Sequence, residues 1–205
     1  MDGIKEAKAK LESQQQDSST KASASTPEPV ENWRFVPLRY RRWGLGDFSP
    51  ELADAVRPFL YGDVSSLYLH GAVGSRKTSL ACAVLQSWAC ERGTEGMSGH
   101  GAFVPMYLFA AAARDFESGK ERLAHWRTAP ILLLDDVGSH RDTPHLTESL
   151  LFLIGHRYDN ERKTIVTTNL TLADFAKHVD PRAASRFQEG IVLNLGMKDS
   201  RRKEK

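Results

Sequence analysis

Residues 69–78 read Leu69-His70-Gly71-Ala72-Val73-Gly74-Ser75-Arg76-Lys77-Thr78. This stretch follows a short apolar run that indicates a buried strand, and it precedes a helical pattern of apolar residues. A glycine-rich loop in that position can cradle phosphates with its backbone N–H groups, helped by the positive end of the helix. We therefore predict a nucleotide-binding loop formed by Gly71, Ala72, Val73, Gly74, Ser75, Arg76, Lys77 and Thr78.

Two side chains of this loop have chemical roles in the prediction. Lys77 would reach the β- and γ-phosphates of ATP, and the hydroxyl of Thr78 would be a ligand of Mg²⁺. Arg76 departs from the motif, because glycine normally stands directly before the lysine. Its side chain must either crowd the phosphates or swing out past the loop. We expect the crowding to prevail, so that Arg76→Gly binds ATP more tightly.

Acidic and amide side chains follow two further predicted strands. Asp135 and Asp136 come directly after the apolar run Ile131–Leu134, and Asn169 follows the run Thr164–Thr168. A carboxylate at such a strand end lies beside the magnesium, and a second one can polarise the attacking water. We assign Asp135 to the metal and Asp136 to the general base. Asn169 would hold the water, a role compatible with capping the next helix.

A pair of arginines lies on one face of a later predicted helix, in the stretch Asp180–Phe187. Arg182 and Arg186 are four residues apart, which places them on one helical face. An arginine that reaches a neighbouring subunit's γ-phosphate would stabilise transition-state charge. A plain surface pair is the alternative.

The remaining pattern predicts an α/β domain with a five-stranded, mostly parallel sheet wrapped by helices. The predicted strands are residues 67–69, 103–109, 131–134, 164–168 and 191–195. Pro105 implies that the second of them is at an edge of the sheet or contains an irregularity. One polar helix is predicted over residues 110–126. Thr143 and Pro144 form a cap and first turn for a helix with an apolar stripe from Leu146 to Tyr158.

The two ends of the chain differ from its centre. Residues 1–30 are rich in Ser, Gln, Lys, Ala and Glu, which predicts a disordered tail before a domain over residues 31–205. No apolar run reaches the ~20 residues of a membrane span, and no signal-peptide core is present, so a cytoplasmic protein is expected. Residues 34–42 carry four arginines and residues 198–205 carry five basic residues. Either stretch could contact DNA phosphates, or simply be solvated.

These motifs, in this order, resemble the AAA+ module. The resemblance is to a Walker A loop, a Walker B strand ILLLDDVG, a sensor 1 strand IVTTNL and a box VII helix RAASRF. The Asp-Asp pair, the stretch HRYDNERKTIVTTNL and the ending VLNLGMKDSRR resemble the DnaC/IstB family in particular. The lead-in VPLRYRRWGLGDF is similar to the part of that family where the chain passes the adenine. The similarity covers residues 36–202.

The resemblance implies a P-loop three-layer sandwich without a helical lid, ATP with Mg²⁺ as cofactors, and a homo-oligomer that completes the site. It makes Asn169 the sensor 1 residue, Arg186 the arginine finger with Arg182 as second candidate, and Arg201 a basic residue near the γ-phosphate. The implied work is loading a replicative helicase onto DNA or assisting a transposase. Two other hypotheses stay open: a pseudo-ATPase adaptor, favoured by Arg76, and a P-loop small-molecule kinase.

Overall fold

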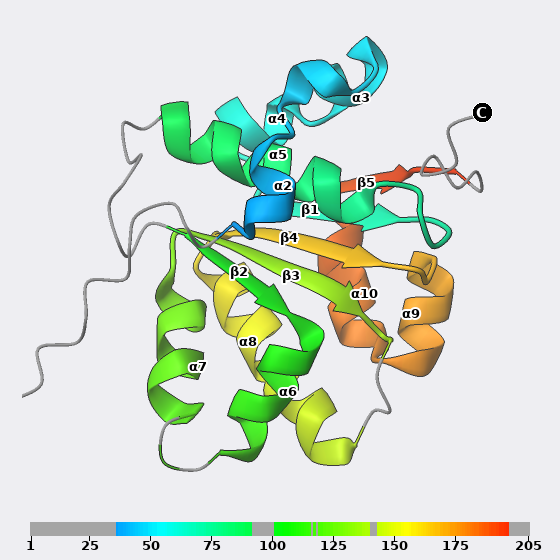
Figure 1. Ribbon diagram of the computed structural model, residues 1–205. Coiled ribbons are helices and arrows are strands. Elements are labelled where there is room, and N and C mark those ends of the chain that lie inside the picture. The colour runs from blue at the N-terminus through cyan, green and yellow to red at the C-terminus, as the bar shows by residue number, and fades with distance from the viewer. Residues whose placement is uncertain (1–35, 92–100, 116, 118, 140–142, 197–205) are drawn as a thin grey trace, which may run out of the picture. The chain divides into compact units, whose positions relative to one another are not determined.

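Five parallel strands in the order β2-β3-β4-β1-β5 form the sheet of the protein, as a computed structural model shows (Figure 1). The structure describes residues 36–91, 101–115, 117, 119–139 and 143–196. The strands are β1 (Ser66–His70), β2 (Ala102–Pro105), β3 (Ile131–Val137), β4 (Lys163–Thr168) and β5 (Ile191–Asn194). The predicted α/β class with a five-stranded parallel sheet is thereby confirmed. The predicted tail over residues 1–30 lies outside the described residues.

Helices cover both faces of this sheet (Figure 1). Before and after β1 come α2 (Leu38–Arg41), the 3-10 helix η1 (Leu45–Asp47), α3 (Pro50–Ala55), α4 (Arg57–Tyr61) and α5 (Lys77–Glu91). The later helices are α6 (Met106–Arg114), α7 (Gly119–Thr128), α8 (Pro144–Asp159), α9 (Leu172–His178) and α10 (Pro181–Gln188). No described helix is both long and apolar enough to cross a membrane.

Alternate residues of each central strand belong to two separate cores. Leu67, Leu69 and Leu133 pack with the apolar face of α5, where Leu80, Val84, Leu85 and Trp88 are buried as predicted. Tyr68 and Leu132 face the other way and pack with α6 to α10. Both faces of the strands are covered, which explains why the strands read as continuous apolar runs rather than alternating ones.

The segment after β2 differs from the prediction. The strand predicted to run from Phe103 to Phe109 ends at Pro105, which caps α6 instead. The alanine run Ala110–Ala113 favours a helix more than the bulky residues before it favour a strand. The single helix predicted over residues 110–126 is in fact the end of α6 and most of α7. The predicted edge position is confirmed, since β2 pairs with β3 alone.

A buried arginine ties the amino ends of the strands to α7 and α8. Arg157 of α8 is 0% exposed. Its Nε donates to Thr164 Oγ1 at 2.9 Å, its Nη1 to the carbonyl oxygens of Trp126 and Ala129 at 2.7 Å each, and its Nη2 to that of Lys163 at 2.7 Å. Burial lowers the pKa of this guanidinium. The charge is thus offset by carbonyl dipoles, and those carbonyls in turn depend on Arg157 as donor.

Arg157→Lys should lower the free energy of unfolding by about 3 kcal/mol, because an ammonium cannot reach this fork of acceptors and leaves buried carbonyls without donors. Urea unfolding of purified protein measures the difference. Arg122→Lys, at an exposed position of α7, is the matched control and should change stability little. Equal stability of the two variants would show that the network does not hold the fold.

Candidate nucleotide-binding site

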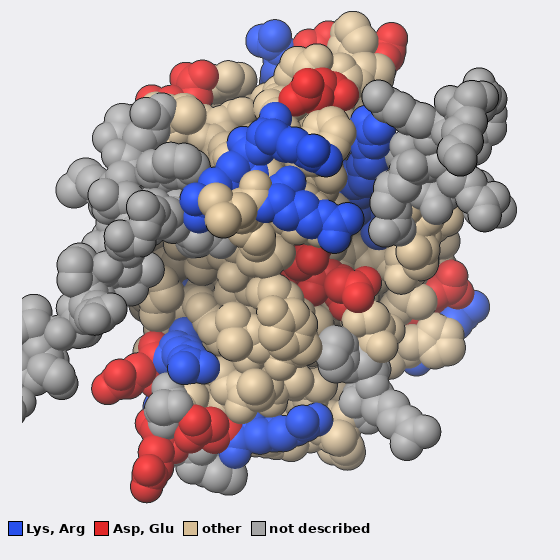
Figure 2. Space-filling model, in the orientation of Figure 1, with Lys and Arg blue, Asp and Glu red and all other residues tan. Residues whose placement is uncertain are grey.

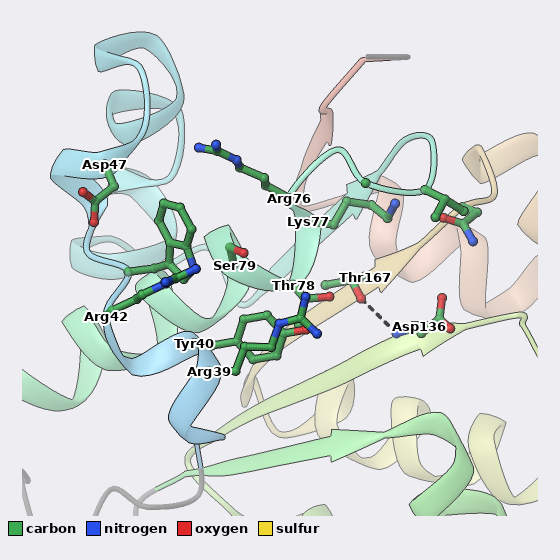
Figure 3. Close-up of a pocket in the computed structure, with 14 residues that line it drawn as sticks. Arg39, Tyr40, Arg42, Asp47, Arg76, Lys77, Thr78, Ser79, Asp136 and Thr167 are labelled. Carbon is green, nitrogen blue, oxygen red and sulfur yellow. Dashed lines mark hydrogen bonds between the residues drawn. The ribbon is translucent and has the colours of Figure 1, made fainter. Parts of the chain in front are cut away.

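The predicted phosphate loop lies at the carboxyl ends of the strands, beside a cavity of about 660 Å³ (Figure 3). Parallel sheets bind ligands at this edge, because the loops that leave neighbouring strands converge there. The cavity is lined by Arg39, Tyr40, Arg42, Trp43, Asp47, Val73, Gly74, Arg76, Lys77, Thr78, Ser79, Asp136, Thr167 and Asn169. The sequence-predicted residues of three segments thus meet at one place.

The backbone of the loop needs its two glycines. Gly71 has φ 147° and Gly74 has φ 86°, both in a region that side chains disfavour. A Cβ on Gly71 would lie 3.1 Å from the carbonyl oxygen of Gly196 and 3.2 Å from Ser75 Oγ. Lys77 is 8% exposed, and its Nζ donates to the carbonyl oxygens of Gly71 and Ala72 at 2.7 Å each. The ammonium is therefore held inside the loop that it would serve.

Asp135 is the centre of the polar contacts beneath this loop. Its Oδ1 accepts from Thr78 Oγ1 at 2.8 Å and from Thr167 Oγ1 at 2.6 Å. Burial raises the pKa of Asp135, and the two hydroxyl donors oppose that rise. The same Thr167 hydroxyl accepts from the backbone N–H of Asp136 at 2.9 Å. Thr167 was not among the predicted site residues, although it stands in the quoted strand IVTTNL.

Asp136 and Asn169 line the cavity from the ends of neighbouring strands. Both are exposed, and Asp136 has φ 62°, a left-handed backbone that a non-glycine residue rarely adopts. That conformation turns the chain directly after Asp135, so the two carboxylates occupy different positions: one buried against hydroxyls, one open to the cavity. Strained residues of this kind cluster at functional sites. The placement suits the two separate roles that the sequence suggested.

Arg76 does not fill the phosphate cradle. Its backbone is also left-handed, with φ 64°. Figure 3 shows its side chain extending away from Lys77, and its guanidinium carbon lies 4.9 Å from the centre of the Trp43 ring. Of the two arrangements that the sequence allowed, the structure therefore has the one in which the side chain swings out past the loop.

The lead-in to the domain, residues 36–48, forms part of the cavity wall, although none of its residues was among the predicted site residues. Arg39, Tyr40, Arg42 and Trp43 all line the cavity. Burial is the main cause that raises the pKa of Tyr40, with the carboxylate of Asp135 adding to it. On the face seen in Figure 2, basic side chains gather beside a group of acidic ones. The mixture of arginine and aromatic residues over 39–43 was the sequence signal that could have identified these residues as part of the cavity wall.

The predicted arginine finger lies elsewhere. Arg186 stands on α10 with its guanidinium carbon 5.5 Å from the centre of the Tyr158 ring. Arg182 pairs with Asp180, Nη2 to Oδ2 at 2.9 Å, next to the cap of the same helix. The two arginines share a groove with Thr147, Glu148 and Phe152, and neither lines the cavity at the phosphate loop. Arg201 lies outside the described residues.

The glycine loop, the Thr78–Asp135 contact and the sheet order together define a P-loop fold of the AAA+ type. No protein-family model and no curated protein matches the sequence. Among solved structures, the DnaC helicase loader matches with a TM-score of 0.65 and 26% identity, over 78% of this chain and 99% of that one. DnaI matches with a TM-score of 0.64 and 20% identity, over 80% of this chain and 95% of that one.

The same fold occurs in a replication initiator. DnaA bound to AMPPCP and single-stranded DNA matches with a TM-score of 0.65 and 20% identity, over 80% of this chain and 52% of that one. This chain thus spans about half of DnaA but nearly the whole of the DnaC and DnaI chains. The protein has a DnaC-like AAA+ fold, which confirms the resemblance seen in the sequence.

Asp135→Asn should make the ligand-free protein more stable at neutral pH, by about 2–4 °C in Tm for a gain near 1 kcal/mol. The raised pKa of Asp135 means that the folded state loses stability as pH rises above the ordinary carboxyl pKa, because ionisation is harder in the fold than in the unfolded chain. Asparagine keeps an oxygen for both hydroxyls and removes the buried charge.

Thermal unfolding at several pH values checks this prediction. The difference from the parent protein should vanish in acid, where Asp135 is protonated. Asp63→Asn, at an exposed position that has no part in raising the pKa of Asp135, is the control and should show no such pH-dependent gain. A destabilised Asp135→Asn at neutral pH would contradict the argument.

Proposed function

We propose that this protein is an ATP-binding AAA+ protein of the DnaC/IstB type, whose residues 31–205 form the nucleotide-binding domain. The observation that carries the proposal is that Lys77 and Thr78 line the cavity and that Thr78 Oγ1 donates to Asp135 Oδ1 directly beside it. Hydroxyl and carboxylate oxygens are the ligands that Mg²⁺ takes from proteins alongside phosphate oxygens. The fit of these donors to Mg²⁺ and triphosphate supports ATP, and the related DnaA was solved with AMPPCP.

Each residue of the site has a role in slow ATP hydrolysis. Lys77 would move from the loop carbonyls, which hold its ammonium at 2.7 Å, onto the phosphates. Thr78 and Asp135 would hold Mg²⁺, which when bound neutralises phosphate charge. Asp136, open to the cavity, would take the proton of the attacking water, and Asn169 would orient that water by hydrogen bonding. Thr167 would position Asp135 through its 2.6 Å bond.

The arginine that contacts the transferred phosphoryl group would come from a second copy of the chain. Phosphoryl transfer gains from an arginine aimed at the transferred group. Arg186 does not line its own chain's cavity, and it stands in an open groove with Arg182 and Phe152. This location supports a homo-oligomer in which Arg186, with Arg182 as the second candidate, completes the neighbour's site. Pairing with Asp180 makes Arg182 the less available of the two.

The work of such an oligomer would be linked to DNA. The fold is shared with the DnaC helicase loader and with DnaA bound to single-stranded DNA. ATP binding would order an assembly that grips DNA, and hydrolysis would release it. On this proposal the protein delivers a replicative helicase or assists a transposase. Arg39 and Arg42, both exposed, offer phosphate contacts at the lead-in.

A pseudo-ATPase adaptor is the second candidate, because Arg76 stands where the motif has glycine. Its left-handed backbone, φ 64°, carries a strain that glycine would not have. The adaptor would use the same surfaces without binding ATP. The preserved set of Lys77, Thr78 and Asp135 favours the ATPase. Titration of purified protein with ATP separates the two candidates.

Lys77→Ala should weaken binding of ATP with Mg²⁺ by more than about tenfold, since it removes the cation that contacts the phosphates. Calorimetric titration measures both affinities. Lys177→Ala, which removes an exposed lysine from α9, is the matched control and should bind as the parent does. If the parent binds no ATP, or Lys77→Ala binds it equally, the nucleotide role is wrong.

Arg186→Ala should leave ATP binding by the monomer unchanged and reduce hydrolysis, because its guanidinium would act on a neighbour's nucleotide. Mixing it with Asp136→Asn should restore part of the activity, since one interface of the mixed assembly joins an intact Asp136 to an intact Arg186. Phosphate release in the mixture is the readout. Stable mixed assemblies without any recovery would argue against action between subunits.

A further inference from the structure

Trp43 has a guanidinium from each of two different segments against its ring. The guanidinium carbon of Arg42, its neighbour in the lead-in, lies 5.2 Å from the ring centre. That of Arg76, from the phosphate loop, lies 4.9 Å away. All three residues line the same cavity as Lys77 and Thr78 (Figure 3). The Arg76–Trp43 contact is therefore a bridge between the phosphate loop and the lead-in across the mouth of the nucleotide site.

The position of this bridge follows from the backbone of the loop. Arg76 adopts φ 64°, and its side chain leaves the loop on the side opposite to the Lys77 ammonium (Figure 3). Lys77 and Thr78 mark where phosphates would lie. The rest of a nucleotide would extend from there along the cavity of about 660 Å³, which the lead-in closes on its other side. Arg76 thus reaches into the space between phosphate loop and lead-in, rather than into the phosphate cradle.

An indole face can hold a cation or a flat ring. Arginine over tryptophan gains cation–π and stacking energy, and a nucleobase stacks on an aromatic side chain with comparable or greater gain. The guanidinium of Arg76 lies over the half-buried Trp43 ring, 4.9 Å from its centre, where a stacked base would lie. A base and the Arg76 guanidinium therefore compete for the same surface.

We propose that Trp43 is the nucleobase-binding surface of this site and that Arg76 is its internal competitor, which a nucleotide must displace from the indole. The inference rests on the proposed nucleotide binding and extends it to the base. It replaces the simple expectation that Arg76 crowds the phosphates. Arg76 therefore weakens the binding of ligands that carry a base and leaves the affinity for ligands of phosphate alone unchanged.

Two ligands distinguish base competition from phosphate crowding: ATP and inorganic tripolyphosphate, each titrated with Mg²⁺. Arg76→Gly should bind ATP about 2- to 5-fold more tightly, the fold-change that corresponds to an exposed cation–π contact. Its affinity for tripolyphosphate should equal that of the parent. Glu161→Gly is the matched control, because Glu161 also has a left-handed backbone, φ 50°, in the turn at the amino end of β4. It should change neither affinity.

Trp43→Ala is tested in the Arg76→Gly background, where the competitor is already absent. The double variant should bind ATP about 5-fold or more weakly than Arg76→Gly alone, because a base loses its stacking partner. Tripolyphosphate should bind both equally. Circular dichroism of each variant confirms that the fold is retained.

Three outcomes would overturn the inference. An equal gain for ATP and tripolyphosphate in Arg76→Gly places the effect at the phosphates, and leaves the proposed ATP binding intact. Unchanged ATP affinity on removing Trp43 from the Arg76→Gly protein shows that the base lies elsewhere, again with ATP binding intact. Failure of both ligands to bind any variant removes the proposed function together with this inference.

Discussion

The rest of the site depends on the hydrogen bonds that the carboxylate of Asp135 accepts. One oxygen accepts hydrogen bonds from Thr78 at the start of α5 and from Thr167 at the end of β4. These hydrogen bonds hold together, at the carboxyl ends of the strands, three segments that are far apart in the sequence. The carboxylate lies among residues that shield it from water, which raises its pKa. On the proposed function, bound Mg²⁺ would compensate this charge.

The amino and carboxyl ends of the strands differ in how each holds a buried basic side chain. At the amino ends of the strands, Arg157 is fully buried and donates to carbonyl oxygens of α7, of Ala129 before β3 and of Lys163 at the start of β4. That end is rigid, because each of the three guanidinium nitrogens donates to an acceptor on another segment or strand. At the carboxyl ends, the Lys77 ammonium donates to carbonyl oxygens of its own loop. These bonds can exchange for phosphate without disturbing the core, so the functional end stays adjustable.

Arg76 shows how a motif can lose a residue while its backbone stays. The loop keeps the left-handed turn that glycine normally supplies, with φ 64°. The side chain then becomes a contact to Trp43 instead of an obstacle inside the loop. The arginine at position 76 therefore changes the lining of the cavity more than it changes the backbone of the loop.

The sequence by itself determined the five-stranded sheet, the helix after the loop and the loop itself, because strand and helix periods, glycines and polar strand ends are local signals. It also determined Asp135, Asp136 and Asn169 as cavity candidates from their places after strands. Only the tertiary structure decided the direction of the Arg76 side chain, its contact with Trp43 and the sharing of Asp135 by Thr78 and Thr167. Those depend on contacts between residues more than thirty positions apart, which no local pattern encodes. The end of β2 at Pro105 was likewise decided by competition between helix and strand propensities that only packing resolves.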